Sequence, residues 1–232
     1  MKGHGHGDYR VPVLAPASIG EAVELVASAF EIAERYRTPV ILLADGIMGQ
    51  AMEPVAPRFR HPPRGEFDWT LTGADGRPPR VLRSLHLQPE RLEGHNDALQ
   101  AKFREIAQRE VRWVGEQLDD ADLAVVAYGT AARVAHSALA RARREGMRVG
   151  LFRPITLWPF PEAQLRELAL QPTAMLVVEL SAGQMVEDVR LAVEGRCPVA
   201  FYGRTGGMVP GPDEVLGQLR LLAAMVRGGG AA

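Results

Sequence analysis

The sequence contains a single cysteine, Cys197, among 232 residues. An iron–sulfur cluster held by cysteines normally needs four thiolates, and a CxxC zinc site needs paired cysteines, so this chain alone can form neither. The sequence also lacks a GxGxxG fingerprint after a strand and a GxxxxGK[ST] phosphate-binding loop. Any redox or nucleotide centre that this chain serves would therefore belong to a partner chain.

Long hydrophobic runs and an excess of one charge are also missing. No apolar stretch reaches the ~18 residues that a membrane helix requires, and the N-terminal MKGHGHGDYR has no apolar segment like that of a signal peptide. The formal net charge is -1, whereas nucleic-acid-binding proteins normally carry a basic surface that neutralises phosphates. We therefore expect a cytoplasmic chain that binds neither a membrane nor nucleic acid.

The residues that are present favour a folded α/β protein. Hydrophobic residues make up 47% of the chain, enough for one or two domains that fold on their own cores. Residues 11–16 and 40–45 are short, uniformly apolar runs of the kind found in parallel strands that are covered on both faces. They predict the two strands of a βαβ unit.

A helix is predicted between these two strands. Ser18 and Glu21 have the spacing of a capping box, and Pro39 marks the end of the helix. Apolar residues recur at helical spacing along it, at Ile19, Val23, Val26, Phe30 and Ala33. Two strands bury too little surface to be stable alone, so we expect another element to cover this unit.

The middle of the chain changes character. Residues 54–94 are rich in Pro, Gly and Arg and predict a long loop, of a length that is usually functional, disordered or part of an interface. An amphipathic stretch over 95–118 then predicts a connecting helix. We therefore expect an N-terminal unit over 1–94, a connecting helix over 95–118 and a second domain over 119–232.

The second domain repeats a strand-then-helix rhythm four times, which indicates an open parallel sheet flanked by helices. The predicted strands are 123–127, 148–152, 175–180 and 199–202, and the predicted helices are 131–145, 161–169, 184–194 and 213–227.

Several segments resemble one family. GDYRVPVLAPAS, AFEIAERYRTPVILLADGIMGQAMEPV, GLFRPITLWPFP, GQMVEDVRLAV and GRTGG are similar, in this order, to the alpha-type subunit of 2-oxoacid:ferredoxin oxidoreductases, and most similar to the 2-oxoisovalerate type. The resemblance implies part of a transketolase pyrimidine-binding-like domain followed by a transketolase C-terminal-like α/β domain.

The resemblance also implies a function. Enzymes of this family use thiamine diphosphate to decarboxylate a 2-oxo acid oxidatively, transfer the acyl group to coenzyme A and pass electrons to ferredoxin. A beta-type partner subunit would supply the diphosphate and Mg²⁺ site and a cluster, and a ferredoxin-like subunit is often present. Iron–sulfur clusters would lie on partner chains only, and this chain would be part of a hetero-oligomer.

One departure from the family pattern concerns catalysis. Family subunits carry, before the GDYR-like stretch, a long part with a YPITPS-like segment, the glutamate that activates the aminopyrimidine ring and an arginine near the substrate carboxylate. This sequence lacks that part, roughly the first third of the subunit. We therefore expect no catalytic residue here and no activity from the isolated chain.

Candidate cofactor-binding or interface residues lie in three places. His4, His6 and Asp8 alternate near the N-terminus. A flexible start of the chain is the favoured interpretation and a metal site the least favoured, while the resemblance puts His6, Gly7 and Asp8 in a loop that borders the cofactor cleft.

The second place follows the strand at 40–45, because ligand-binding loops of open α/β sheets lie at the carboxyl ends of strands. Its glycines would let the backbone turn tightly or approach a neighbour. An ordinary loop remains the alternative to a contact with the cofactor cleft or the partner. The candidates are Asp45, Gly46, Gly49, Gln50 and Glu53, with Met52 beside them.

The third place is Arg204 in the glycine-rich segment 203–207, which could hold an anion such as a coenzyme A phosphate or could be a simple turn. The Pro-rich segment 153–161 is interpreted as packing, with Trp158-Pro159 or Phe160-Pro161 as possible cis bonds. Glu179 is interpreted as a paired acid and Gly129-Thr130 as a helix cap.

Two other functions remain open. The chain could be a non-catalytic module that docks partner subunits, or an independent coenzyme A binder built on the second domain.

Overall fold

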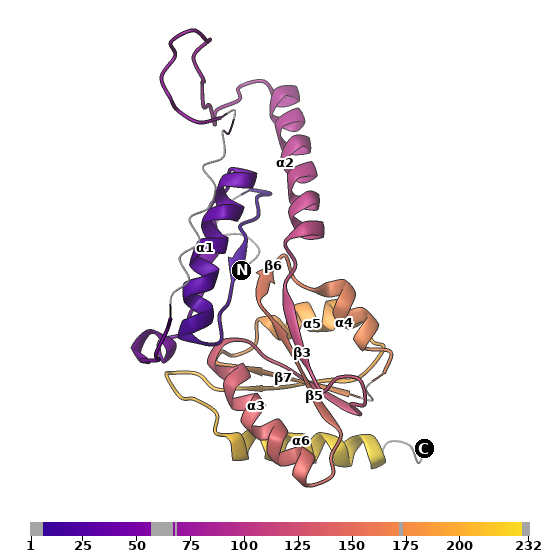
Figure 1. The fold of residues 1–232 in the computed structure, drawn as a ribbon. Helices are drawn as coiled ribbons and strands as arrows, with labels where there is room; N and C mark the ends of the chain where they lie inside the picture. Colours follow the sequence, from indigo (N-terminus) through magenta and orange to yellow (C-terminus); the bar gives the residue numbers. More distant parts are fainter. Residues whose placement is uncertain (1–6, 57–66, 68, 172–173, 229–232) are drawn as a thin grey trace.

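The computed structural model describes residues 7–56, 67, 69–171 and 174–228. It contains two α/β units, each built around its own sheet, with a long helix beside the first unit (Figure 1). The first unit comprises β1 (Val13–Leu14), α1 (Ile19–Tyr36), β2 (Ile41–Leu42), the 3₁₀ turn η1 (Met48–Gln50) and α2 (Pro89–Arg109). The second unit comprises β3 (Trp113–Glu116), β4 (Leu123–Val126), α3 (Gly129–Arg144), β5 (Val149–Pro154), α4 (Glu162–Leu168), β7 (Ala174–Glu179), α5 (Met185–Val193), β8 (Val199–Gly203) and α6 (Pro212–Gly228). β6 (Thr156–Trp158) lies between β5 and α4 in the sequence but belongs to the first sheet.

The predicted βαβ unit is confirmed. β1 pairs in parallel with β2, and α1 connects them. At the N-terminus of α1, the Ser18 hydroxyl accepts a hydrogen bond from the Glu21 amide at 3.1 Å, as the capping box predicts. The helix ends at Arg37, whose left-handed φ of 47° stops it two residues before Pro39.

The element that covers this unit comes from the second half of the chain. β6 pairs antiparallel with β1, so the first sheet has the order β2-β1-β6. Trp158 at the end of β6 joins a buried cluster with Leu14, Ile32 and Phe103. The peptide bond between Trp158 and Pro159 is cis.

The apolar repeat along α1 correctly predicts a helix, but it does not mark the buried face. The buried residues are Leu25, Ile32 and Tyr36, which pack on the first sheet and on α2. Phe30 is 63% exposed, and Val23 and Val26 are exposed beside it. The helix therefore has two apolar faces, and only one of them is covered by residues that the structure describes.

The predicted connecting helix exists, but both of its predicted ends are wrong, because α2 spans Pro89–Arg109 instead of 95–118. It begins earlier because proline suits the first helical position, where no amide donor is needed. It ends earlier because Glu110 turns inward and accepts hydrogen bonds from Tyr36 at 2.9 Å and Arg35 at 3.0 Å. The residues after it form β3, an antiparallel edge strand on β5.

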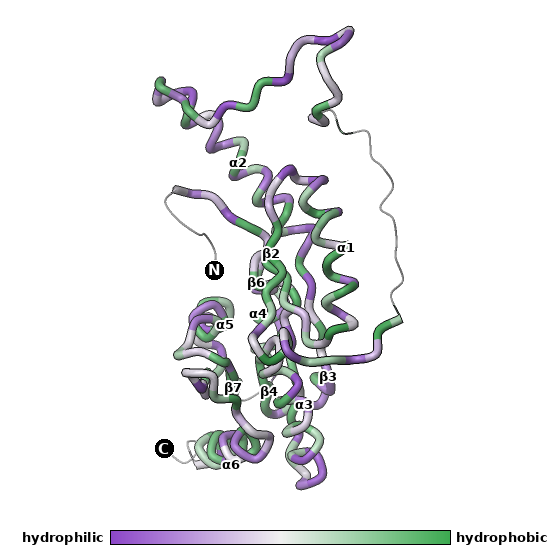
Figure 2. Tube along the Cα trace, turned by 90° about the vertical axis from the view of Figure 1, so that its left-hand side faces the viewer, coloured by the Kyte–Doolittle hydropathy of each residue, from purple (hydrophilic) through white to green (hydrophobic). Residues whose placement is uncertain are grey.

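The long loop lacks helices and strands over 69–88, the part of it that the structure describes before α2 begins. This segment projects beyond the end of α2 (Figure 1), and hydrophobic and hydrophilic residues alternate along it (Figure 2). Large apolar side chains are exposed on it at Leu71, Val81, Leu82, Leu85 and Leu87.

The four predicted strands of the second unit are confirmed. The sheet has the order β3-β5-β4-β7-β8, with β5, β4, β7 and β8 parallel. α3 and α6 cover one face, and α4 and α5 cover the other (Figure 1). All residues of β4 and β7 are buried, which explains why β4, and β7 up to its last residue Glu179, are apolar runs in the sequence.

In the described residues, no helix is long and apolar enough to cross a membrane. The boundaries of the three predicted parts, at residues 94 and 118, stay predictions.

Candidate functional site

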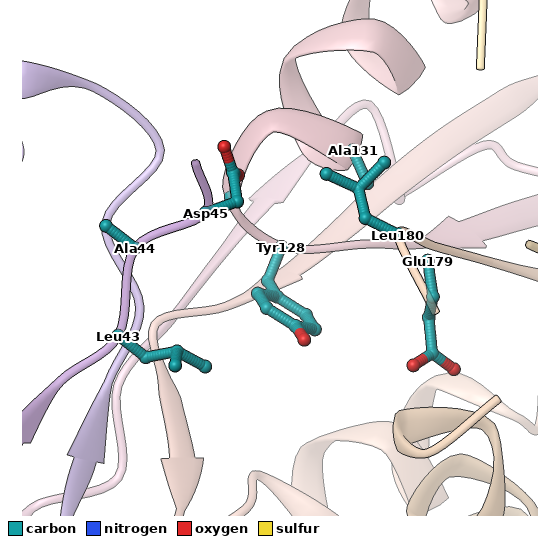
Figure 3. Close-up of a pocket in the computed structure, with 8 residues that line it drawn as sticks. Leu43, Ala44, Asp45, Tyr128, Ala131, Glu179 and Leu180 are labelled. Carbon is teal, nitrogen blue, oxygen red and sulfur yellow. The ribbon is translucent and has the colours of Figure 1, made fainter. Parts of the chain in front are cut away.

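The two units meet at a cavity of about 150 Å³. It lies where the carboxyl ends of β2, β4 and β7 come together (Figure 3). β4 is the point at which the strand order of the second sheet reverses, because the chain continues from it to β5 on one side and later to β7 on the other. Crevices at such points are where open α/β sheets bind ligands. The lining residues are Leu43, Ala44, Asp45, Tyr128, Gly129, Ala131, Glu179 and Leu180.

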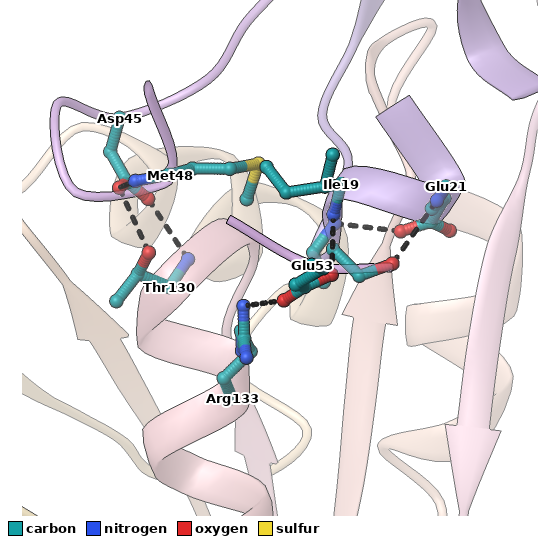
Figure 4. Close-up of polar contacts among 9 residues, drawn as sticks. Ile19, Glu21, Asp45, Met48, Glu53, Thr130 and Arg133 are labelled. Atoms are coloured by element: carbon teal, nitrogen blue, oxygen red, sulfur yellow. Dashed lines mark hydrogen bonds and ion pairs between the residues drawn. The ribbon is translucent and has the colours of Figure 1, made fainter. Parts of the chain in front are cut away.

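Asp45 is the side chain that connects the two units at this cavity. Its Oδ2 accepts a hydrogen bond from the Thr130 amide at 2.9 Å, and its Oδ1 accepts one from the Thr130 hydroxyl at 2.8 Å (Figure 4). Oδ1 also accepts from the amides of Ile47 at 3.2 Å and Met48 at 3.0 Å. A carboxylate of the first unit therefore caps the N-terminus of α3 in the second.

The electrostatics of Asp45 follow from these bonds. Burial on its own would raise the pKa of Asp45, but the hydrogen bonds from Met48, Thr130 and Ile47 outweigh burial, so the pKa lies below its ordinary value of 3.8. Gly129 permits the close approach: its φ is +57°, and a Cβ there would lie 3.1 Å from Asp45 Oδ2.

Glu53 holds the other end of the same loop. Its Oε2 accepts a hydrogen bond from the Ile19 amide at 2.9 Å, and its Oε1 pairs with Arg133 of α3 at 2.6 Å (Figure 4). The bond from Ile19, supported by Arg133, lowers the pKa of Glu53. Glu53 therefore caps α1 and contacts α3 at the same time.

The loop between these two anchors faces outward. Met48 is buried, but Gly46, Ile47, Gly49 and Gln50 are exposed, and Met52 is 97% exposed. A Cβ at Gly46 or Gly49 would meet nothing within 4 Å, and neither glycine has a positive φ. The expected tight turn is confirmed, because residues 46–47 form a turn and Met48–Gln50 a 3₁₀ turn, although neither glycine adopts a positive φ there. An approach by a neighbour remains a prediction.

Glu179, the last residue of β7, caps the N-terminus of α5 as Asp45 caps that of α3. It is 1% exposed, and it accepts hydrogen bonds from the Val186 amide at 2.9 Å, the Met185 amide at 3.0 Å and the Ser181 hydroxyl at 2.9 Å. The interpretation of Glu179 as a paired acid is confirmed.

Tyr128 lies between the two carboxylates (Figure 3). Burial, with the negative charges of Glu179 and Asp45, raises the pKa of Tyr128 to about 12. Its hydroxyl therefore keeps its proton at neutral pH. Because the helix N-termini of α3 and α5 already hold carboxylates, the cavity does not offer an anion an unfilled helix terminus.

The other candidate residues lie elsewhere. Gly7 and Asp8 are exposed, and the Asp8 carbonyl accepts a hydrogen bond from Gln100 at 3.1 Å. His4 and His6 lie outside the described residues. Within the described ranges, no three His, Cys, Asp or Glu side chains are grouped closely enough to hold a metal ion.

Arg204 follows β8 and does not line the cavity. Its guanidinium pairs with Glu214, which also accepts hydrogen bonds from Tyr202 at 3.0 Å and from the Gly211 amide at 2.6 Å. This carboxylate already engages the guanidinium that an anion would need.

Sequence reasoning found Asp45 and Glu53 but missed Thr130 and Arg133 as their partners. One signal could have indicated the missing contact. Thr130 comes at the start of a helix whose N-cap residue, Tyr128, makes no side-chain capping bond, so the α3 N-terminus needs an acceptor from elsewhere.

Two family models match the chain. Residues 4–62 match "Pyruvate flavodoxin/ferredoxin oxidoreductase, thiamine diP-bdg", and residues 121–215 match "Pyruvate:ferredoxin oxidoreductase core domain II". The chain is also 42% identical over 224 residues to the ketoisovalerate oxidoreductase subunit VorB of Methanothermobacter thermautotrophicus. This chain belongs to the 2-oxoacid:ferredoxin oxidoreductases. The match covers 96% of the chain but only 63% of the relative's length.

More distant members of the family are similar over the same span. The 2-oxoglutarate synthase subunit KorA of Methanothermobacter marburgensis is 32% identical, and the match covers 92% of this chain and 64% of that subunit. The chain of the 2-oxoglutarate:ferredoxin oxidoreductase from Magnetococcus marinus, solved with 2-oxoglutarate, coenzyme A and succinyl-CoA bound, is 20% identical with a TM-score of 0.75. That match covers 94% of this chain and 43% of the other.

The fold is shared beyond the family. A split-gene transketolase, described as an inactive beta4 tetramer, matches with a TM-score of 0.53 and 16% identity over 91% of this chain and 56% of its own. The expected fold class, transketolase-like α/β units in succession, is therefore confirmed.

Proposed function

We propose that this chain forms one wall of a thiamine diphosphate cleft in a 2-oxoacid:ferredoxin oxidoreductase. The observation that carries the proposal is the loop from Asp45 to Glu53. It lies at the carboxyl end of a parallel strand, inside the region that matches a thiamine-diphosphate-binding family model. Both of its ends are fixed, while most of the residues between them are exposed in the part of the chain that the structure describes.

The described residues fit one side of the cofactor only. The cavity of about 150 Å³ is smaller than the roughly 300–1,000 Å³ typical of pockets that enclose a small molecule. The open space beside Gly46 and Gly49 leaves room for a flat group or a partner backbone. We assign the diphosphate and Mg²⁺ site to a beta-type partner subunit.

The proposed reaction is the oxidative decarboxylation of a 2-oxo acid. The bond between the carbonyl carbon and the carboxylate breaks, CO₂ leaves, and the acyl group forms a thioester with coenzyme A. The electron pair that is released passes through iron–sulfur clusters on partner chains, including a ferredoxin-like subunit, to ferredoxin. Thiamine diphosphate supplies the carbanion chemistry when bound.

The proposed substrate is a branched-chain 2-oxo acid such as 2-oxoisovalerate. Support comes from identity, which is 42% with a ketoisovalerate subunit and 32% with a 2-oxoglutarate subunit over similar spans. The relatives are named as subunits, so we expect the active form to be a hetero-oligomer. Its cytoplasmic location stays a prediction.

Two assays test this function. The subunit that contains this sequence, co-expressed with its partner chains, should reduce ferredoxin with 2-oxoisovalerate and coenzyme A faster than with 2-oxoglutarate. The chain alone should show no turnover with thiamine diphosphate and Mg²⁺. Activity of the isolated chain, or an assembled complex that is inactive with every 2-oxo acid, would contradict the proposal.

A docking module without a role in the cofactor cleft is the second candidate. The exposed apolar residues of the 69–88 segment favour it, since such a surface is typical of a contact with another protein. Titration of the beta-type subunit with this chain separates the two functions. A role in the cleft predicts tighter binding when thiamine diphosphate is present, and pure docking predicts no change. An independent coenzyme A site at Arg204 receives no support, because Glu214 engages that guanidinium.

A further inference from the structure

The loop from Asp45 to Glu53 depends on the second unit for its conformation. Asp45 and its partner Thr130 are 85 positions apart in the sequence, and Glu53 and its partner Arg133 are 80 apart. Both partners belong to α3 and lie one turn apart on it. The two ends of an exposed loop in the first unit are therefore attached to a single helix of the second.

Asp45 performs two tasks with one carboxylate. It accepts two hydrogen bonds from Thr130, and it accepts two more from the amides of Ile47 and Met48, which begin the loop. Any movement of α3 relative to the first sheet must break one set of bonds or carry the loop along. The carboxylate thus couples the position of α3 to the shape of the loop.

The geometry points to Asp45 as a positioning residue. It holds the 46–52 loop in a conformation set by α3, and this raises the affinity of the assembled enzyme for thiamine diphosphate. The effect on the cofactor rests on the proposed function, since it requires the loop to face the cleft. The coupling between α3 and the loop does not.

The alternative is that Asp45 only caps a helix. Glu179 provides the comparison, because it caps α5 beside the same cavity, and its hydrogen bonds lie within residues 179–186 of the second unit. Loss of a capping bond at α5 should loosen α5 without changing the loop of the first unit.

Two matched substitutions test the coupling. Thr130→Val removes the hydroxyl that donates to Asp45, and Ser181→Ala removes the hydroxyl that donates to Glu179. Both leave the carboxylates and the backbone donors in place. Hydrogen–deuterium exchange is then measured on the wild-type chain and on both variants. Asp45→Asn is a larger perturbation than Thr130→Val, because it removes the charge of the carboxylate that accepts all four hydrogen bonds.

We expect Thr130→Val to accelerate amide exchange at residues 46–52, although the substituted residue lies outside the loop. Ser181→Ala should accelerate exchange at the start of α5 only. If Thr130→Val changes exchange at the start of α3 but leaves 46–52 unchanged, Asp45 is a simple cap and the coupling is wrong.

The cofactor effect is measured in the complex assembled with the partner chains. We expect Thr130→Val and Asp45→Asn to raise the KM for thiamine diphosphate, by on the order of tenfold for Asp45→Asn, with a much smaller change in kcat. Ser181→Ala should not raise that KM. An unchanged KM in Asp45→Asn, despite faster exchange in the loop, would overturn the effect on the cofactor.

A separate measurement shows whether the proposed function itself fails. A wild-type complex that does not bind thiamine diphosphate in calorimetry would contradict the function and the cofactor effect together. The exchange experiment would still decide whether α3 sets the shape of the loop.

Discussion

The guanidinium of Arg153 forms a bidentate ion pair with the carboxylate of Glu21, with both N–O distances at 2.9 Å. The two residues are 132 positions apart and join β5 of the second unit to the first turn of α1. Glu21 also accepts a hydrogen bond from the Ala17 amide at 2.6 Å. Like the Asp45–Thr130 contact, this pair fixes the N-terminal end of a helix from the other unit.

Removal of one partner should destabilise the chain. Both side chains are largely buried, so Arg153→Met leaves the Glu21 carboxylate with part of its hydrogen bonding lost. We expect a loss of about 1.5–3 kcal/mol in the free energy of unfolding, measured with urea. Arg220→Met, which breaks an exposed pair with Glu145, is the control and should cost much less. Equal losses of unfolding free energy in the two variants would show that the Glu21–Arg153 pair stabilises the chain no more than an exposed ion pair does.

Acid should weaken the junction between the units. The folded-state pKa values of Asp45 and Glu53 lie below their ordinary values of 3.8 and 4.5. The unfolded chain therefore binds protons first, and the stability these groups contribute is present above those ordinary values and is lost as pH falls through the lower folded values. Urea unfolding from pH 6 down to about pH 3 measures the loss.

Comparing Asp45→Asn with wild type measures how much the Asp45 carboxylate contributes to this pH dependence of stability. The variant should be less stable than wild type at pH 6, and the difference should shrink as the pH falls. A difference that stays constant with pH would contradict the account, because it would mean that the charge of Asp45 contributes nothing.

Gly129 should not tolerate a side chain. Alanine would have to adopt a φ of +57° and place its Cβ 3.1 Å from Asp45 Oδ2. The left-handed conformation alone costs about 1–2 kcal/mol. Gly146→Ala is the matched control, since its φ is +81° but its Cβ would meet nothing within 4 Å. Urea unfolding should show a greater loss for Gly129→Ala; a smaller loss would mean that Asp45 does not need this close approach.

The Tyr128 hydroxyl should ionise at a higher pH than an ordinary tyrosine. Burial and two neighbouring carboxylates raise its pKa to about 12. Its ordinary value is 10.0, so the stability from keeping its proton is present below pH 10 and declines as pH rises toward 12. Ultraviolet absorbance of tyrosinate, compared between wild type and Tyr128→Phe, assigns the transition. A transition near pH 10 that vanishes in the variant would contradict the buried site.

The sequence predicts the second unit well for a physical reason. Its parallel strands are covered on both faces, so Leu123–Val126 and Ala174–Glu179 are almost wholly apolar and stand out between helices. The end of the long helix was misjudged because Val111 and Val114 continue a helical repeat locally. Only the pairing of Trp113–Glu116 with β5, which is distant in sequence, makes part of this stretch an edge strand.

The sequence predicts part of the candidate site and not the rest. Asp45 and Glu53 could be selected because they follow a buried strand, where ligand loops of open sheets lie. Their partners on α3 could not be paired with them, since those contacts span 80 residues or more, and the lack of a capping side chain at Tyr128 indicates only that α3 needs some acceptor. Phe30 shows the converse: helical spacing identifies its helix, but tertiary packing decides which apolar face is buried.

The central claim is that this chain supplies one wall of a shared cofactor cleft. Calorimetric titration with thiamine diphosphate and Mg²⁺ tests it most directly, first on this chain alone and then on the subunit assembled with its beta-type partner. We predict no detectable heat from the chain at millimolar cofactor and saturable binding to the assembly. Stoichiometric binding to the chain by itself would contradict the claim.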